Sequence, residues 1–252
     1  MKLDGKRALI TGAMGGIGRK VAERFAAEGA ELALADAVSG ESPVAGARCY
    51  QVDLSSVAEC RRLAAEVEAD LGPIDLLANC VGVFEQAPFD ETTEENWDRN
   101  VDINLKGVFF LIQAVAPQMR ARGGGRVVNI TSIAAIQGFG TAQAYCAAKG
   151  GLLNLTQALA MALAPDGINV NAVGPGFIRT QMTEHQWTDD AFNAGLARML
   201  ATRKGYMEPE NIAAAVLFLC SDDAAHIHGT NLRVDDGWLS GISGAAFSDT
   251  HA

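Results

Sequence analysis

Three polar side chains in the middle of the chain have the types and spacing needed for proton transfer. Tyr145 and Lys149 are four residues apart in a segment whose small and apolar residues recur at helical spacing, so we expect them on one face of a helix. A free phenol has a pKa of about 10, and a neighbouring ammonium favours the phenolate. We therefore predict that Lys149 lowers the pKa of Tyr145 by roughly 1 to 3 units, into the range of acid–base catalysis.

Ser132 stands at the end of an apolar run, residues 126–130, that is rich in β-branched residues and predicts a buried strand. Its hydroxyl could donate a hydrogen bond to the oxygen of a carbonyl or alcohol held beside the phenol. Taken alone, a tyrosine and a lysine at this spacing more often form a surface pair on a helix. The rest of the chain must therefore decide between the two interpretations.

A glycine-rich turn near the N-terminus predicts a dinucleotide site. Residues 6–11 read as a strand, the glycines at 12, 15, 16 and 18 follow it at once, and a helical stretch continues to residue 28. Glycines permit a tight turn and close approach of the backbone, and the start of a helix attracts a pyrophosphate. Strand 31–35 ends in Asp36, whose carboxylate is placed to accept hydrogen bonds from the adenosine ribose and to repel a 2′-phosphate. NAD is therefore expected rather than NADP, and the alternative for Asp36 is a solvated turn residue.

These features together resemble the short-chain dehydrogenase/reductase family, over nearly the whole chain. Ser132 lies thirteen residues before Tyr145, after a strand reading Val-Val-Asn-Ile-Thr-Ser, and the turn has the spacing Gly-x-x-x-Gly-x-Gly. The resemblance implies that Ser132 polarises the substrate oxygen, that Tyr145 exchanges its proton, and that Lys149 lowers the pKa of the tyrosine and binds the nicotinamide ribose. Asn104 matches an asparagine that holds a water next to this lysine; the alternative is a buried structural asparagine.

The resemblance also implies the residues that bind the cofactor. Asp53 and Leu54 would line the adenine pocket, residues 174–176 would form a wall at the nicotinamide ring, and Ile178 and Thr180 would contact its carboxamide. Cys80 and Val81 depart from the usual Asn-Asn-Ala-Gly segment. The complete set expected at the cofactor is Gly12, Met14, Gly15, Gly16, Ile17, Gly18, Asp36, Asp53, Leu54, Asn79, Gly82, Tyr145, Lys149, Pro175, Gly176, Ile178 and Thr180.

A segment without clear periodicity, about residues 180–206, stands where the family has its substrate lid. His185 and Trp187 are substrate candidates there, with equal weight given to a purely structural role as anchors of the lid. The expected pocket mixes polar and apolar side chains, which indicates a partly polar substrate. Its members are Ala134, Ile136, Gln137, Phe139, Gln143, Phe177, Met182, His185 and Trp187.

Strands alternate with helices along the whole chain, which predicts a Rossmann-like α/β fold. We expect a doubly wound parallel sheet of about seven strands with helices on both faces. One domain would span residues 1–252, with 1–100 mainly binding the dinucleotide and 101–252 forming the catalytic half. The helices at 97–120 and 142–163 have more small and apolar surface than one sheet can cover, so we expect a homo-oligomer. The resemblance implies a dimer or tetramer, and the tail, residues 240–252, is expected to fray or to lie on a neighbouring subunit.

Composition excludes several other classes of protein. The net charge of −10 and the pI near 4.8 argue against nucleic-acid and anionic-membrane partners. No apolar run approaches the roughly 18 residues of a membrane span, and the N-terminus lacks a secretory pattern. Five scattered cysteines without zinc-ligand spacing fit reduced thiols in a cytoplasm, and no metal site is expected.

The predicted activity is reversible hydride transfer between NAD and a secondary alcohol or ketone. The first alternative is the reduction of a 3-oxoacyl thioester, which uses the same catalytic residues. Asp36 opposes that alternative, because this biosynthetic role usually draws on NADPH. A more remote alternative is a non-enzymatic NAD-binding sensor on the same fold, which the joint retention of Asn104, Ser132, Tyr145 and Lys149 opposes.

Overall fold

A seven-stranded parallel sheet in the order β3-β2-β1-β4-β5-β6-β7 forms the centre of the molecule. The computed structural model describes residues 1–241, so the prediction for the tail lies almost wholly outside the described residues. All six neighbouring pairs of strands are parallel, which confirms the predicted doubly wound fold. The strands are β1 Arg7–Thr11, β2 Glu31–Asp36, β3 Arg48–Gln51, β4 Leu76–Asn79, β5 Gly125–Ile130, β6 Ile168–Pro175 and β7 Asn231–Val234.

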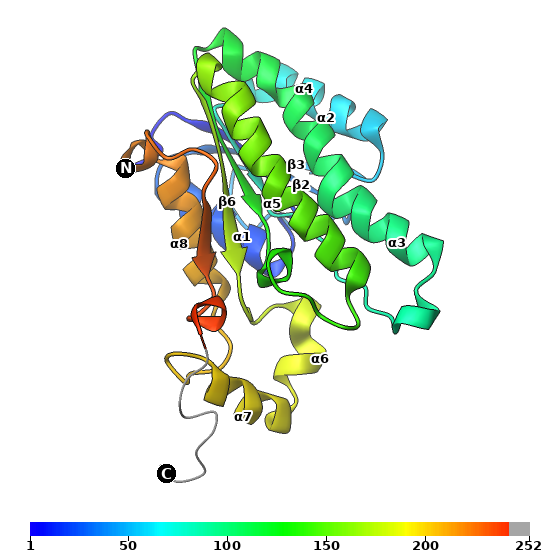
Figure 1. Cartoon of the computed structure of the whole chain (residues 1–252). Coiled ribbons are helices and arrows are strands. Elements are labelled where there is room, and N and C mark those ends of the chain that lie inside the picture. The colour runs from blue at the N-terminus through cyan, green and yellow to red at the C-terminus, as the bar shows by residue number, and fades with distance from the viewer. Residues whose placement is uncertain (242–252) are drawn as a thin grey trace.

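Helices cover both faces of this sheet (Figure 1). Helices α2, α4 and α5 share one hydrophobic core with the sheet, and α1 and α8 share the other. Successive strand residues point to opposite faces, so Leu9 enters the first core and Ile10 the second. The helices are α1 Gly16–Ala27, α2 Val57–Leu71, α3 Glu94–Val101, α4 Val108–Ala121, α5 Gln143–Leu163, α6 Glu184–Trp187, α7 Asp190–Met199 and α8 Pro209–Cys220.

Local contacts fix the ends of two elements. Helix α2 is capped by Ser56, whose side chain accepts from the backbone nitrogen of Glu59, and the carboxylate of Asp53 accepts from the backbone nitrogen of Ser55 at 2.9 Å. Strand β6 continues through Pro175, because β7 pairs with its last residues up to Pro175 opposite Val234. The glycine and proline there therefore stay within the sheet.

The predicted helix over residues 97–120 is interrupted by a π-helical turn, Asp102–Gly107, between α3 and α4. Asn104 lies in this turn, where its amide nitrogen donates to the carbonyls of Val83 and Asn100 at 3.0 and 2.8 Å. Its amide oxygen accepts from the backbone nitrogen of Val83 at 3.2 Å. Single π turns often occur at functional sites. Here the turn holds the chain that follows β4.

A buried chain of polar side chains joins β4, β5 and α5. The amide nitrogen of Asn79 donates to the side-chain oxygen of Asn129 at 2.9 Å, and Asn129 donates to the hydroxyl of Thr156 at 3.0 Å. Thr156 donates in turn to the carbonyl of Leu152 at 2.8 Å. Buried polar groups are stable only with such partners, so this chain fixes α5 against the middle of the sheet.

Among residues 1–241, none of the helices combines the length and the apolar character needed to cross a bilayer.

We predict that Thr156→Val lowers the free energy of unfolding by about 1–3 kcal/mol, because the amide of Asn129 loses its buried acceptor. Urea denaturation followed by circular dichroism measures this change. Thr141→Val is the matched control, because Thr141 is exposed and its hydroxyl has no hydrogen-bond partner among residues 1–241. Equal effects of the two substitutions would show that the buried chain contributes nothing to stability.

Candidate active site

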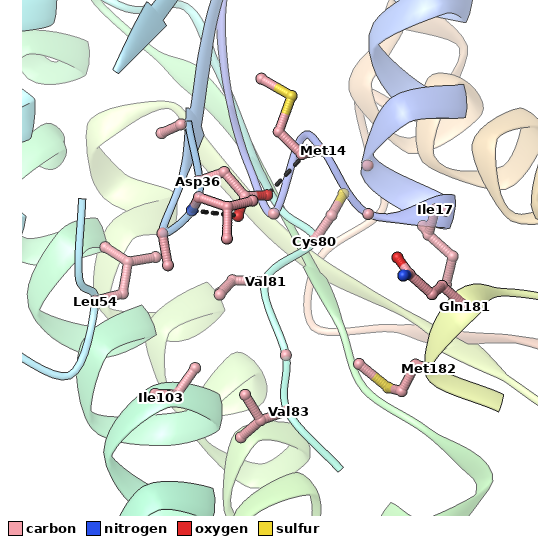
Figure 2. Close-up of a pocket in the computed structure, with 18 of the residues that line it drawn as sticks. Met14, Ile17, Asp36, Leu54, Cys80, Val81, Val83, Ile103, Gln181 and Met182 are labelled. Carbon is pink, nitrogen blue, oxygen red and sulfur yellow. Dashed lines mark hydrogen bonds between the residues drawn. The ribbon is translucent and has the colours of Figure 1, made fainter. Parts of the chain in front are cut away.

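A cavity of about 550 Å³ opens at the carboxyl ends of β1, β2, β3 and β4. It lies where the strand order reverses between β1 and β4. In open parallel sheets, this reversal leaves a crevice in which ligands bind. Figure 2 shows Asp36 and Leu54 at one side of the cavity and Gln181 and Met182 at the other.

The glycine-rich turn between β1 and α1 has no room for side chains at its two critical positions. Gly12 has a φ of 63°, and a Cβ there would lie 2.8 Å from the backbone of Val81. A Cβ on Gly18 would lie 2.1 Å from the carbonyl oxygen of Gly12. The first turn of α1 follows Gly15, which offers no side chain to cap it. This turn therefore fits a pyrophosphate, which can approach the backbone closely and accept from the uncapped amides.

The carboxylate of Asp36 is fixed against this turn at the end of β2. One oxygen accepts from the backbone nitrogen of Met14 at 2.9 Å and the other from that of Val38 at 3.2 Å (Figure 2). Each oxygen keeps capacity for a further hydrogen bond, which a ribose hydroxyl could fill. Within the described part of the chain, Arg99 is the one cationic side chain that lines the cavity, and it forms an ion pair with Glu85.

The structure places most of the predicted cofactor residues around this cavity. Six predicted members do not line it. Asn79, Lys149 and Ile178 are buried, Pro175 ends β6, and Tyr145 and Gly176 line the second cavity described below. Sequence reasoning missed Val83 and Ile103, which line the cavity but carry no chemical signal as isolated apolar residues. The predicted residues that line it are Gly12, Met14, Gly15, Gly16, Ile17, Gly18, Asp36, Asp53, Leu54, Gly82 and Thr180.

Ser132, Tyr145 and Lys149 come together beyond the carboxyl end of β5. Ser132 caps a short 3₁₀ turn, and its hydroxyl accepts from the backbone nitrogen of Ala134 at 3.1 Å. Tyr145 and Lys149 lie in the first two turns of α5, as the spacing predicts. Lys149 is only 2% exposed; its Nζ donates to the carbonyl of Ile130 at 2.8 Å and lies 5.7 Å from the centre of the Tyr145 ring.

Burial dominates the electrostatics of this group and contradicts the expectation of a lowered phenol pKa. Loss of hydration raises the pKa of Tyr145 to about 12, although a hydrogen bond with Ser132 acts in the opposite direction. Burial also lowers the pKa of Lys149 to about 8. Sequence spacing predicts proximity but not desolvation, and burial disfavours both charges. The Lys149 ammonium donates to a backbone carbonyl rather than to the phenol oxygen.

Asn104 and Lys149 approach each other at Gly82. A Cβ on Gly82 would lie 3.1 Å from the side-chain oxygen of Asn104 and 3.6 Å from Nζ of Lys149. The side chain of Asn104 is itself held by both backbone polar groups of Val83. The structure therefore brings together the four residues expected to take part in catalysis, through the π turn and the first turns of α5.

A second cavity, of about 500 Å³, adjoins Ser132 and Tyr145. Met182 lines both cavities, so the two meet beside the catalytic group. The second cavity is enclosed by the segments after β4, β5 and β6, by α6 and α7, and by Trp238. Its lining residues are Phe84, Gln86, Ser132, Ile133, Ala134, Phe139, Tyr145, Gly176, Phe177, Met182, Thr183, Gln186, Ala191, Phe192, Gly195, Leu196, Met199 and Trp238.

Of the predicted substrate residues, the structure places Ala134, Phe139, Phe177 and Met182 in the walls of this cavity.

The other predicted substrate residues lie outside it. His185 is exposed, and Trp187 donates its ring N–H to the carbonyl of Thr180 at 2.9 Å. The side-chain oxygen of Gln137 accepts from the indole nitrogen of Trp238 at 2.6 Å and thus helps to hold the Trp238 ring in the cavity wall. Gln143 donates to the carbonyl of Gly140, and Ile136 is 55% exposed beside a neighbouring groove.

Sequence reasoning missed several aromatic walls. Phe84 packs edge-to-face on Tyr145 with ring centres 4.7 Å apart, and Trp238 packs in the same way on Phe177 at 4.9 Å. Phe192 lies in α7 within the aperiodic lid segment. Local spacing carries no signal for these residues, because they reach the cavity from segments that are distant in the sequence.

Comparison with known proteins agrees with this geometry. The family described as enoyl-(acyl carrier protein) reductase matches residues 12–239. An NAD-dependent glycerol dehydrogenase of Listeria innocua is 37% identical over 239 residues, with 92% of this chain and 93% of the relative covered. A D-threitol dehydrogenase of Mycolicibacterium smegmatis is also 37% identical, over 246 residues that make up 94% of each chain.

Solved structures give the same result. The crystal structure of a putative 2-deoxy-D-gluconate 3-dehydrogenase from Agrobacterium tumefaciens with bound NADP superposes with a TM-score of 0.85 at 37% identity, over 95% of this chain and 98% of the other. A putative short-chain alcohol dehydrogenase from Sinorhizobium meliloti reaches 0.89 at 34% identity, over 96% of this chain and 99% of the other. The chain therefore belongs to the short-chain dehydrogenase/reductase family and is a nicotinamide-dependent oxidoreductase acting on CH–OH groups.

Proposed function

We propose that the protein catalyses reversible hydride transfer between NAD and a secondary alcohol or ketone, with Tyr145 as the acid and base. The convergence of Ser132, Tyr145 and buried Lys149 where the two cavities meet carries this proposal. The dinucleotide, when bound, supplies the group that accepts or delivers hydride. The Gly12–Gly18 turn and Asp36 would hold it, because they leave room for a pyrophosphate and offer a carboxylate to a ribose.

The substrate oxygen is positioned by two hydroxyl groups. Ser132 already accepts from the amide of Ala134. Its own O–H, which interacts with Tyr145, can turn to donate to the substrate oxygen. In oxidation, the phenolate of Tyr145 takes the hydroxyl proton as the carbonyl forms. In reduction, the phenol of Tyr145 returns that proton to the oxygen.

Lys149 stabilises the phenolate once it forms. Attraction between the two charges is strong at a site from which water is excluded, and Lys149 is almost completely buried. Asn104, held beside Lys149 near Gly82, completes a route along which the proton leaves for solvent. This role for Asn104 follows from its place and from the family resemblance.

Asp36 supports NAD as the cofactor. Its fixed carboxylate would repel the 2′-phosphate of NADP, and no lysine or arginine next to it in the sequence could neutralise that phosphate. The glycerol dehydrogenase relative is named for NAD, whereas three of the structural relatives were solved with NADP. The Asp36 carboxylate favours NAD over NADP for the present chain.

The assembly is proposed to be a homotetramer in the cytoplasm. Met161 on α5 is 76% exposed, and Phe109 and Phe110 on α4 are only partly buried. Such apolar surface on two long helices suits packing between subunits. The five cysteines are free thiols, in keeping with a reducing compartment.

Tyr145→Phe is expected to lower kcat by about 10³-fold or more, because the proton donor and acceptor is lost. The affinity for NADH should change little, and fluorescence titration with NADH measures it alongside steady-state turnover. Retention of turnover in this variant would remove Tyr145 from the mechanism.

Asp36→Asn is expected to reduce the ratio of kcat/KM for NADH to that for NADPH by about tenfold or more, because the repulsive charge is removed. Asp53→Asn is the matched control, since Asp53 lines another part of the cavity and binds the amide of Ser55. Its ratio should stay close to that of the unaltered enzyme. A similar loss of discrimination in both variants would contradict the role given to Asp36.

The two directions of the reaction should depend on pH with opposite signs. Oxidation needs the phenolate, and burial raises the pKa of Tyr145, so kcat for alcohol oxidation should increase between about pH 7 and pH 10. Reduction needs the protonated phenol and should not increase over the same interval. Initial rates in both directions test this, and a profile for oxidation that falls with pH would contradict phenolate as the base.

A further inference from the structure

The second cavity is walled mainly by aromatic and other apolar side chains. Its five aromatic residues other than Tyr145 come from separate segments of the chain, and two of them, Phe177 and Trp238, pack edge-to-face. Flat apolar groups gain most from such walls, through burial and through contact with ring faces. The five are Phe84, Phe139, Phe177, Phe192 and Trp238.

The cavity offers little to charged or highly hydroxylated molecules. Among residues 1–241, none that lines the cavity is a lysine, arginine, histidine, aspartate or glutamate. A buried carboxylate needs a cationic or multiple hydrogen-bonding partner, so a sugar acid has no counterpart here. Each buried hydroxyl left without a partner costs about 1–3 kcal/mol, which opposes an open-chain polyol or sugar.

Polar side chains other than the catalytic pair are few. The hydroxyl of Thr183 donates to the carbonyl of Ile178 at 2.7 Å, so it is already used. The side-chain oxygen of Gln186 accepts from the hydroxyl of Tyr206 at 3.1 Å, which leaves the amide N–H groups of Gln186 as donors. Gln86 lies at the exposed edge of the cavity. Gln186 therefore has amide N–H groups that could donate to a second oxygen of a substrate.

We propose that the substrate is an uncharged alicyclic or aryl-substituted secondary alcohol, or the matching ketone, an inference that rests on the proposed hydride transfer. The ring lies against Phe177 and Trp238, and a second oxygen accepts a hydrogen bond from Gln186. In oxidation, the carbinol C–H bond breaks and its hydride reduces NAD⁺ to NADH. The O–H proton passes to Tyr145, and the carbon–oxygen double bond forms.

This class departs from the substrates for which several relatives are named. Glycerol, D-threitol and galactitol are polyols, and the chains named for them are 35–37% identical to this one. Substrate cavities are formed by loops and lids that vary on a common scaffold. The aromatic walls found here are therefore stronger evidence for this chain's substrate than those names.

A substrate panel at saturating NAD tests the class. We expect kcat/KM for cyclohexanol, 1-indanol and 1-phenylethanol to exceed that for galactitol, D-xylose and gluconate by about 100-fold. Reduction of a 3-oxoacyl thioester with NADH is measured alongside reduction of 1-indanone and should be slower. Preference for a polyol, a sugar, a sugar acid or the thioester would overturn the proposed class.

Substitution of one wall tests the placement of the ring. Phe177→Ala should lower the ratio of kcat/KM for 1-indanol to that for butan-2-ol by about tenfold. Phe89→Ala is the matched control, because Phe89 is 77% exposed and does not line the cavity. An unchanged ratio in Phe177→Ala would show that the substrate ring does not lie against Phe177.

A binding measurement separates failure of the substrate class from failure of the reaction. Calorimetric titration of 1-indanone into Tyr145→Phe loaded with NADH, with and without Phe177→Ala, reports on the cavity without turnover. Binding that depends on Phe177, together with no hydride transfer in the unaltered enzyme, would support the cavity assignment and overturn the proposed reaction. Turnover of polyols or sugar acids without measurable binding of 1-indanone would overturn the substrate class and leave the reaction intact.

Discussion

The burial of one ammonium group is the constraint on which the site depends. Lys149 has almost no contact with solvent, and its Nζ is held by the carbonyl of Ile130 at the end of β5. Removing water disfavours the charged form of each side chain, so it lowers the pKa of Lys149 and raises the pKa of Tyr145. The same exclusion of water strengthens attraction between the two charges when they exist together. The site therefore favours a neutral phenol at rest and stabilises its anion mainly within the charged pair.

The middle of the sheet supports this arrangement. Asn79, Asn129 and Thr156 connect β4, β5 and α5 through buried hydrogen bonds. They thus link the strand that presents Ile130 to the helix that carries Lys149. Because both cavities open at the same edge of the sheet and share Met182, one set of strands positions the dinucleotide and the substrate together.

The order of the elements and the main chemistry could be predicted from sequence. Glycines at a strand–helix turn, Asp36 after the next strand, and the spacing of Tyr145 and Lys149 are local signals that backbone geometry translates directly into position. The parallel seven-stranded sheet follows from the alternation of strands and helices.

The remaining features depend on contacts between distant segments. The pKa of Tyr145 is governed by burial, which spacing along a helix does not reveal. Phe84, Phe192 and Trp238 enter the second cavity from segments that are far apart in the sequence. His185 and Trp187 lie in the segment where the lid was expected, but neither lines the second cavity. His185 is exposed to solvent, and the indole of Trp187 donates to the carbonyl of Thr180.

The interruption between α3 and α4 makes the length of that segment as important as its composition. A π turn closes its hydrogen bonds over five residues instead of four, so the two flanking helices do not continue a single helical register. Deleting one residue there would rotate one helix against the other by roughly 100°. The hydrogen bonds of Asn104 with the backbone of Val83 would break, and Gly107 would no longer pack against the backbone of Leu54. Natural variation in this stretch is therefore expected to exchange residues while keeping their number constant.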